Sequence, residues 1–504
     1  MLILLLLTPL MTGVACRLLY RRQKAMEAVN ALGALVMLGL TAAVVVVVVA
    51  VAQDGPRRAA WDIFYVDALS AVMLATVALL GTAAALVSIG YLRRDLDARN
   101  VPEGRRGLGW YYLGLHAFLW TMLATVSVEN IGLLWVGIEA TTLASALLVG
   151  FYRTPEALEA AWKYVILCTI GITFALFGVL LLYYASVQSG TSSLNWTTLS
   201  ANAQALDADM LRPAFIFILI GFGAKAGFAP LHTWLADAHS QAPSPISGVL
   251  SGVLLACALY GILRVHAITS VAIGGNFSSN LLLGFGVLSV AVATPFIIVQ
   301  RDLKRLLAYS SVEHIGLMAV GFGIGGALGT YAALLHLVNH AATKGALFFV
   351  TGDVVQRYGA RKISAIRGVL RAAPLTGWLF LLGLFAITGA PPAGVFISEI
   401  AVAGAGLSGD RLRIAATIVV MLLLGLIFAG MLAHGMRLLY GTPSRMRGHG
   451  EANRTWRSDL PWLAGLAPLL LVIVLFGVYV PSPVSDLLDD AVAVLTPLSG
   501  TAGR

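Results

Sequence analysis

The stretch that decides the fold is GFGAKAGFAPLHTWLADAHSQAPSP, residues 221–245, which follows directly on the apolar run FIFILI. It places Lys225 and then Pro230 at the end of a segment that is otherwise apolar enough to lie in a membrane. A lysine at mid-bilayer costs about 2.5–3.5 kcal/mol on insertion scales, and a proline interrupts the hydrogen bonding of a helix. We therefore predict a discontinuous membrane helix that carries a functional lysine.

The composition of the whole chain supports a membrane protein. The 504 residues are 59% hydrophobic and only 11% charged, whereas a soluble domain is about a quarter charged. The net charge of +9 does not indicate nucleic-acid binding, because the arginines lie in short loops between apolar runs. The first residues, MLILLLLTPLM, lack a positive region and read as a retained first span rather than a signal peptide.

Apolar segments long enough to cross about 30 Å of hydrocarbon recur along the chain and predict about fourteen helices in an all-α polytopic fold. We expect a single membrane domain over residues 1–504, divided into the first three helices (1–110), a first unit (111–268), a second unit (281–440) and a last helix (462–480).

The loop charges predict the orientation. Of the 33 lysines and arginines, 24 fall in alternate loops on one side and seven fall on the other side. Basic loops stay in the cytoplasm, so we expect a bacterial-type cytoplasmic membrane protein with both termini outside.

A second break is expected at Pro391-Pro392, in the apolar segment that also carries Glu399. The two breaks lie about five helices apart, so they take equivalent places in two five-helix units. An odd number of crossings inverts the second unit. Paired discontinuous helices in inverted repeats are typical of transporters, with binding near the midplane.

Few ionisable side chains fall well inside the predicted helices. Glu139 and Lys225 are two of them, and we hypothesise that they form a switchable ion pair that turns charge movement into proton movement. The alternative for each is a structural side chain with polar neighbours. Glu313 and His314 are ambiguous, as are groups near predicted boundaries such as Asp67.

His336, His340 and Lys344 recur every four residues, so they share one face of a helix. This stripe favours a proton relay, with core histidines as the alternative. A metal site is disfavoured because a third ligand is missing nearby and Lys344 is cationic. Glu399 is the acid of the second broken helix, with an interfacial role as its alternative.

No other chemistry is expected in the chain. The three cysteines lie alone in separate apolar segments, and no motif for a nucleotide, redox cofactor or metal is convincing. We therefore expect no cofactor, no metal and no catalytic redox centre.

Three motifs, KAGFAPLHTWLADAHSQAPSPISG, DLKRLLAYSSVEHIG and HLVNHAATKGALFF, resemble the antiporter-like membrane subunits of respiratory complex I, group 4 membrane-bound hydrogenases and multisubunit sodium/proton antiporters. WVGIEATTLASALLVG and YSSVEHIG look most like component F of hydrogenase-4, and next like subunit M of bacterial NADH:quinone oxidoreductase. The resemblance implies fourteen helices, two inverted five-helix repeats, a half-channel in each repeat and redox chemistry in partner subunits.

The resemblance also implies a proton pathway. By position, Glu139 and Lys225 match the family's glutamate and broken-helix lysine. The stripe of histidines and Lys344 matches the central axis, and Glu399 matches the acidic end point of subunit M. Ala256 departs from the pattern, because complex I members usually carry a lysine or histidine there.

The expected function is proton translocation as one membrane subunit of a redox-driven complex, of the hydrogenase-4 or NADH:quinone oxidoreductase type. Its expected partners are other membrane subunits, a peripheral redox arm, the lipid bilayer and protons. Two alternatives remain: a subunit of a cation/proton antiporter, and a non-conducting anchor in which Ala256 marks an interrupted pathway.

Overall fold

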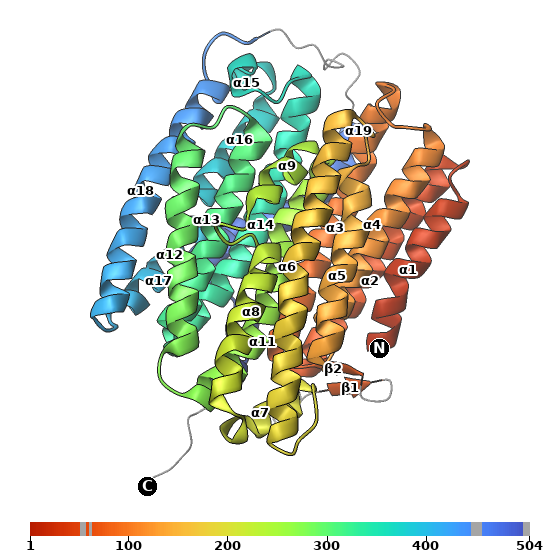
Figure 1. Ribbon diagram of the computed structural model, residues 1–504. Helices are drawn as coiled ribbons and strands as arrows, with labels where there is room; N and C mark the ends of the chain where they lie inside the picture. Colours follow the sequence, from red (N-terminus) through yellow and green to blue (C-terminus); the bar gives the residue numbers. More distant parts are fainter. Residues whose placement is uncertain (51–56, 60–62, 445–455, 497–504) are drawn as a thin grey trace.

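The computed structural model describes residues 1–50, 57–59, 63–444 and 456–496, and it is a bundle of long, roughly parallel and antiparallel helices (Figure 1). The far C-terminal tail, which the sequence analysis placed outside the membrane, lies beyond the described residues.

The first part of the bundle runs from α1 to α6. Its elements are α1 (Leu2–Leu18), α2 (Gln23–Ala50), β1 (Arg57–Ala59), β2 (Phe64–Val66), α3 (Ala68–Asp97), α4 (Arg105–Thr125), α5 (Ile131–Val149) and α6 (Pro155–Gln188).

The first interrupted helix and its surroundings follow. The elements are α7 (Trp196–Ala201), the 3-10 turn η2 (Ala203–Ala205), α8 (Ala208–Ala226), α9 (Thr233–Gln241), α10 (Ser244–Val249), the π-helical turn η3 (Leu250–Leu254) and α11 (Leu255–Ile273).

The remaining elements form the second half. They are α12 (Phe277–Ile298), α13 (Leu303–Ile324), α14 (Gly326–Tyr358), η4 (Ile363–Ala365), α15 (Val369–Ala372), α16 (Pro374–Ile387), α17 (Gly394–Leu407), α18 (Arg411–Leu439), α19 (Trp456–Val478) and α20 (Ser482–Leu495).

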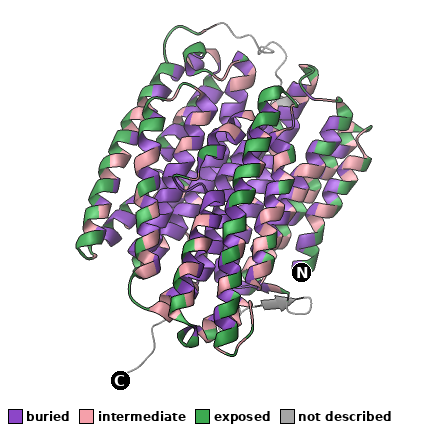
Figure 2. Ribbon diagram, viewed as in Figure 1, coloured by how far each residue is buried: buried purple, intermediate pink, exposed green. Residues whose placement is uncertain are grey.

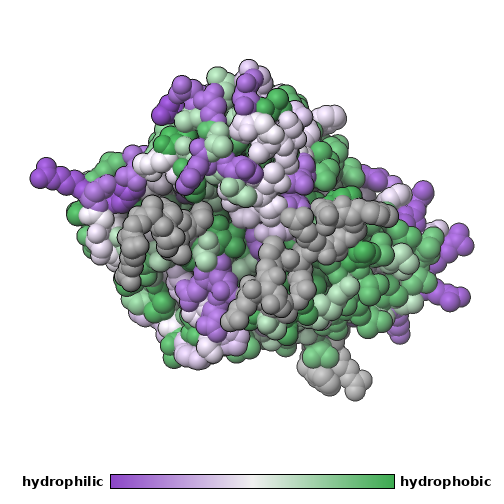
Figure 3. Space-filling view, turned by 90° about the horizontal axis from the view of Figure 1, so that it is seen from below, coloured by the Kyte–Doolittle hydropathy of each residue, from purple (hydrophilic) through white to green (hydrophobic). Residues whose placement is uncertain are grey.

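Nine of the described helices are long and apolar enough to cross a membrane, and three shorter apolar helices, α1, α16 and α17, accompany them. Exposed residues follow the outer faces of the bundle, whereas the helices at its centre are buried on all sides (Figure 2). Viewed from the end that carries α7, hydrophobic residues form much of the rim and hydrophilic ones gather in places (Figure 3). This distribution fits a polytopic membrane protein.

Side-chain caps start several of these helices. The carboxylate of Asp302 accepts hydrogen bonds from the first backbone N–H groups of α13, and Asn130 does the same for α5. Thr154 caps α6, and Pro155 takes its first position. Such caps satisfy N–H groups that have no partner inside the helix. Helices α6 and α13 therefore begin at Pro155 and Leu303, before the apolar segments that hydropathy alone predicts at 164–186 and 308–325.

A small sheet was not predicted from the sequence. Strands β1 and β2 pair antiparallel at the end of the bundle that carries α7, so the fold is not purely helical (Figure 1). The signal for these strands is short and lies between two strongly apolar segments, which masks it.

A buried ion pair anchors the same end of the bundle. The guanidinium of Arg264 on α11 donates to both carboxylate oxygens of Asp67, at 2.6 and 2.7 Å, and to the hydroxyls of Ser70 and Tyr260. The ring of Trp196 on α7 lies 4.5 Å from the guanidinium. Burial alone would raise the pKa of the Asp67 carboxyl, but the facing guanidinium holds that pKa below its usual value. The ion pair thus joins α3, α7 and α11.

We predict that Asp67→Asn lowers the free energy of unfolding by about 3–5 kcal/mol, because it leaves the Arg264 guanidinium buried without its counter-charge. The measurement is thermal unfolding of the purified protein in lipid nanodiscs. The control is Asp209→Asn, which breaks an exposed pair with Arg212 and leaves the unfolding midpoint unchanged. Equal stability of Asp67→Asn and wild type would contradict the structural role.

Candidate functional site

The first interrupted helix presents Lys225 to the interior. Helix α8 ends one residue after Lys225, and Gly227 then takes a left-handed conformation with φ of 87°. The chain resumes as α9 at Thr233. Trp234 on α9 donates its indole N–H to the Ala224 carbonyl at 2.9 Å, which satisfies one of the carbonyl groups that the helix end would leave free. The predicted break near Pro230 is confirmed.

The ammonium group of Lys225 is fully buried and is held by neutral groups. Its Nζ donates to Thr142 Oγ1 at 2.9 Å and to the hydroxyl of Tyr164. It also lies 4.5 Å from the centre of the Tyr164 ring and 5.9 Å from that of Trp234. Hydrogen bonds and aromatic faces together replace part of the hydration that the ammonium loses.

Glu139 reaches Lys225 through a hydroxyl. The Thr142 hydroxyl donates to Glu139 Oε2 at 3.3 Å and accepts from Lys225. It therefore lies between the Glu139 carboxylate and the Lys225 ammonium. Thr169 on α6 donates to the other carboxylate oxygen at 3.0 Å. Within the described part of the chain, the hypothesised ion pair is therefore indirect. Glu139 is only partly buried, on the flank formed by α5 and α6.

The second interruption places Glu399 in the interior. Helix α16 ends at Ile387, and α17 begins at Gly394, with Glu399 buried in its second turn. Gly389 lies between them with φ of 67°, and a Cβ at this position would overlap the Glu399 carboxylate. The break is thus shaped to receive the carboxylate, and its prediction from Pro391-Pro392 is confirmed.

The polar stripe on α14 is buried throughout. His336 accepts or donates at both ring nitrogens, with His314 Nδ1 at 3.0 Å and Ser398 Oγ at 2.9 Å, so it links α13 to α17. His340 has no hydrogen-bond partner among the described residues, and its ring centre lies 5.2 Å from that of His314. Lys344 Nζ donates to the carbonyl of Leu307 at 2.7 Å and to a serine hydroxyl. All three stripe residues face α13.

The structure adds Glu313 and His314, whose positions the sequence analysis left ambiguous. Both are buried, and they lie near the middle of α13, which starts earlier than hydropathy indicates. A carboxylate oxygen of Glu313, a ring nitrogen of His314 and a carboxylate oxygen of Glu399 all lie within 4.8 Å of one another. The adjacent acid and histidine in YSSVEHIG were the available signal, and correct helix boundaries would have revealed it.

The region between the two halves contains hydroxyl groups. Ser251, in the π-helical turn that precedes α11, shares a 2.7 Å hydrogen bond with Ser311 on α13. Ser310 beside it accepts a hydrogen bond from Lys344. Ala256 is buried one turn further along α11 and provides no polar group.

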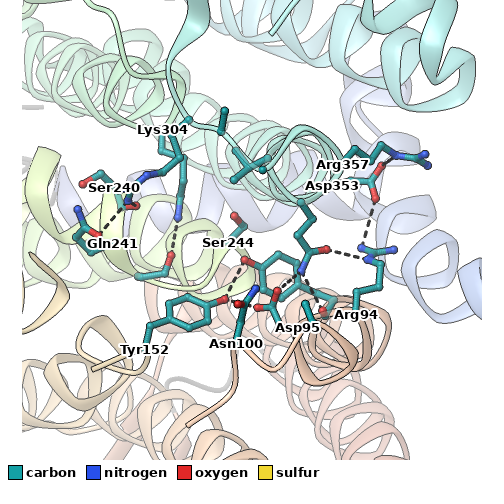
Figure 4. Close-up of a pocket in the computed structure, with 18 of the residues that line it drawn as sticks. Arg94, Asp95, Asn100, Tyr152, Ser240, Gln241, Ser244, Lys304, Asp353 and Arg357 are labelled. Carbon is teal, nitrogen blue, oxygen red and sulfur yellow. Dashed lines mark hydrogen bonds and ion pairs between the residues drawn. The ribbon is translucent and has the colours of Figure 1, made fainter. Parts of the chain in front are cut away.

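A polar pocket of about 600 Å³ opens at the end of the bundle where α3 and α14 finish (Figure 4). Asp95 and Tyr152 line one wall, and Lys304 reaches down from α13 to the Ala242 carbonyl on the other (Figure 4). Lys304 is only 3% exposed although it lines this pocket. The surrounding loops belong to the side rich in lysine and arginine.

One buried histidine adjoins the pocket residues in the sequence. His239 precedes the pocket residues Ser240 and Gln241, is fully buried and has no partner for either ring nitrogen among the described residues. Its ring stacks on Phe348, one turn beyond Lys344, with ring centres 5.4 Å apart. His239 was not singled out from the sequence, because its motif was interpreted through Lys225 and Pro230.

Comparison with known proteins places the chain in a family. Residues 129–425 match a protein-family model that describes the transmembrane region of NADH:quinone oxidoreductase and Mrp antiporter subunits. A hydrogenase-4 component F homolog from Methylacidiphilum infernorum is 39% identical over 426 residues, which cover 84% of this chain and 87% of that protein. NADH-quinone oxidoreductase subunit N from Desulforudis audaxviator is 30% identical over 442 residues, 86% of this chain and 85% of that protein.

The fold is similar to that of a solved membrane complex. A chain in the structure of the Mrp complex from Dietzia sp. DQ12-45-1b matches with a TM-score of 0.83 at 21% identity and covers 99% of this chain and 98% of that one. The resemblance to component F of hydrogenase-4 is confirmed, and the resemblance to subunit M stays a prediction. The family match spans both interrupted helices and the buried polar groups between them, and the chain belongs to the NADH:quinone oxidoreductase/Mrp antiporter family of membrane subunits.

Proposed function

We propose that this chain translocates protons as a membrane subunit of a redox-driven complex, of the hydrogenase-4 or NADH:quinone oxidoreductase type. The observation that carries the proposal is the series of buried titratable groups that passes from one interrupted helix to the other. Its buried members are Lys225, Lys344, His340, His336 and Glu399, and the partly buried Glu139 lies beside Lys225 at its start. Protons cross hydrocarbon only through such groups and the water between them, and buried charges without a function are rare in membranes.

The helix order supports two inverted repeats. When each interrupted helix counts once, the apolar helices give fourteen spans, with repeats formed by α4 to α11 and by α12 to α18. In each repeat the interrupted helix is the fourth of five. We assign the half-channels to these repeats and both termini to the outer side of the cytoplasmic membrane, on the distribution of basic loops.

The position of Glu139 supports a neighbouring membrane subunit. Its carboxylate is partly exposed on a largely apolar flank, where Leu143 and Leu147 on α5 and Ile170 on α6 are exposed. A carboxylate that faces lipid is costly. A second membrane subunit against this flank would cover Glu139 and change its charge state. In our proposal the peripheral redox arm is a further partner in the same complex.

Two alternatives use different observations. Membership in a family that includes Mrp antiporters favours a cation/proton antiporter subunit. The apolar Ala256 favours a non-conducting anchor, although the hydrogen bond between Ser251 and Ser311 supplies polar groups nearby. Proton flux that depends on sodium in the assembled complex would support the antiporter, and flux that is unchanged by Glu139→Gln would support the anchor.

We predict that Lys225→Ala abolishes proton uptake into vesicles that contain the assembled complex, because the buried ammonium carries the proton between the hydroxyls around it. Uptake is driven by an imposed membrane potential and followed with a pH-sensitive dye. Lys163→Ala is the control, because Lys163 is an exposed lysine paired with Glu159 and Asp237. Undiminished uptake by an assembled Lys225→Ala complex would contradict the proposal.

The Thr142 hydroxyl should set the rate of exchange between Glu139 and Lys225. We predict that Thr142→Val slows proton uptake roughly fivefold, since a hydrogen bond contributes about 1 kcal/mol and each 1.36 kcal/mol changes a rate tenfold. Thr173→Val is a matched control, because the Thr173 hydroxyl donates to the Thr169 carbonyl of its own helix at an exposed site. Equal rates for Thr142→Val and wild type would show that the hydroxyl bridge is not used.

The pocket beside Lys304 provides an entry for protons from the basic side. We predict that Gln241→Cys is modified by a membrane-impermeant thiol reagent added on the cytoplasmic side, and that modification lowers proton uptake. The native Cys16, Cys168 and Cys257 are all buried, so the wild-type protein treated with the same reagent serves as the control. Efficient labelling without any loss of uptake would contradict an entry at this pocket.

A further inference from the structure

The structure brings two carboxyl groups together at the far end of the buried series. Glu313 on α13 is 2% exposed and Glu399 on α17 is 9% exposed, and one oxygen of each lies within 4.8 Å of the other. They come from different helices, so their approach depends on the tertiary fold. Two carboxylates at this separation repel each other, and burial removes the water that would screen them.

A histidine is aimed at the same place. His314 is fully buried, and its Nε2 has no hydrogen-bond partner among the described residues. This nitrogen lies 3.5 Å from Glu313 Oε2. The opposite nitrogen, Nδ1, is 3.0 Å from His336 Nε2. His314 thus connects the stripe on α14 with the two carboxyl groups.

The same pairing occurs in the first half of the chain. Glu139 and Lys225 are separated by 86 residues, and Glu313 and Glu399 are separated by 86 residues as well. In the repeats proposed above, Glu139 and Glu313 both lie on the second helix, and Lys225 and Glu399 both lie on the interrupted helix. Glu313 therefore lies on the helix that corresponds to that of Glu139, and its partner is an acid after the interruption instead of a lysine before it.

We propose that Glu313 and Glu399 share one proton, which His314 delivers, so that the second repeat ends in a two-carboxyl proton site rather than in Glu399 alone. The proposal rests on the proton-translocating function proposed above. Glu313 then acts as a proton-binding group, and His314 carries the proton to it.

The transfer balances in two steps. A proton that arrives along the stripe makes His336 an imidazolium. His336 then releases its Nε2 proton to His314 Nδ1 and returns to the neutral form with a proton on Nδ1, while His314, which already carries a proton on Nε2, becomes the imidazolium. His314 then releases its Nε2 proton to Glu313 Oε2. The N–H bond breaks, an O–H bond forms, and His314 returns to the neutral state. The proton then exchanges between Glu313 and Glu399 without a redox step.

The packing around Glu399 keeps the two carboxyl groups together. Its carboxylate lies against the backbone of Gly389, where any side chain would collide with it. Ser398 beside it is bonded to His336, which fixes the start of α17 against α14. The proton site is therefore held by the interruption between α16 and α17.

The test is infrared difference spectroscopy of the assembled complex in lipid, with the exchange of H₂O for D₂O as the perturbation. A shared proton gives a carboxylic C=O stretching band that shifts in D₂O. We expect this band to disappear in Glu313→Gln and also in Glu399→Gln, since either change removes the pair. Glu159→Gln, at an exposed glutamate, is the control and leaves the band unchanged.

Several outcomes would overturn the proposal. One is the absence of the band in wild type, as expected if a divalent cation occupied Glu313, His314 and Glu399 and kept both carboxylates ionised. Another is a band that survives Glu313→Gln in a complex whose assembly is verified by gel filtration. If Glu313→Gln fails to assemble, Glu313→Asp serves instead, with the band expected at an altered frequency; an unaltered band overturns the proposal.

Proton uptake is measured on the same variants. We expect Glu313→Gln to reduce uptake as strongly as Glu399→Gln does, with the double variant no slower than either single one. Loss of uptake in Lys225→Ala together with an unaffected Glu313→Gln would reject the two-carboxyl site and leave the proposed function standing. Full uptake in Lys225→Ala would reject the function, while the infrared band would still report the shared proton.

Discussion

The arrangement of the molecule depends on one constraint, which is that the Lys225 ammonium has to be accommodated where water is scarce. The structure does this with neutral groups: a threonine hydroxyl, a tyrosine hydroxyl and two aromatic faces. A directly paired carboxylate would hold the charge more firmly and make the proton harder to move. The end of α8, the indole of Trp234 and the position of α5 all serve this environment.

The interrupted helices solve a second problem, because they place polar backbone at membrane depth without leaving it unsatisfied. The Ala229 N–H in the first interruption donates to Ser289 on α12 at 3.0 Å. In the second, the Ala390 N–H donates to the Phe385 carbonyl at 2.9 Å. Non-helical backbone at this depth is tolerated only where protein or a water-filled cavity surrounds it. The two breaks are therefore fixed structural features that hold Lys225 and Glu399 in position.

Hydropathy and proline positions were enough to predict the membrane class, the two interruptions and the side chains worth testing. They could not predict contacts between helices. Thr142 resembles any helical threonine until α8 brings Lys225 against it. Glu313 stayed ambiguous because a cap, rather than an apolar residue, starts α13. Arg264 was counted as a loop charge, but its partner Asp67 lies almost two hundred residues away in the sequence. Such pairings depend on tertiary structure.

The helix packing changes how the missing basic side chain at Ala256 is interpreted. The π-helical turn just before it widens the helix and directs Ser251 toward α13, where Ser311 meets it beside the residues that hold Lys344. π-helical turns are frequent at functional sites in helices. Hydroxyls cannot store a proton as a lysine does, but they can orient water between two groups that do. The second repeat then has to store the proton itself, and the paired carboxyl groups of Glu313 and Glu399 are suited to that task.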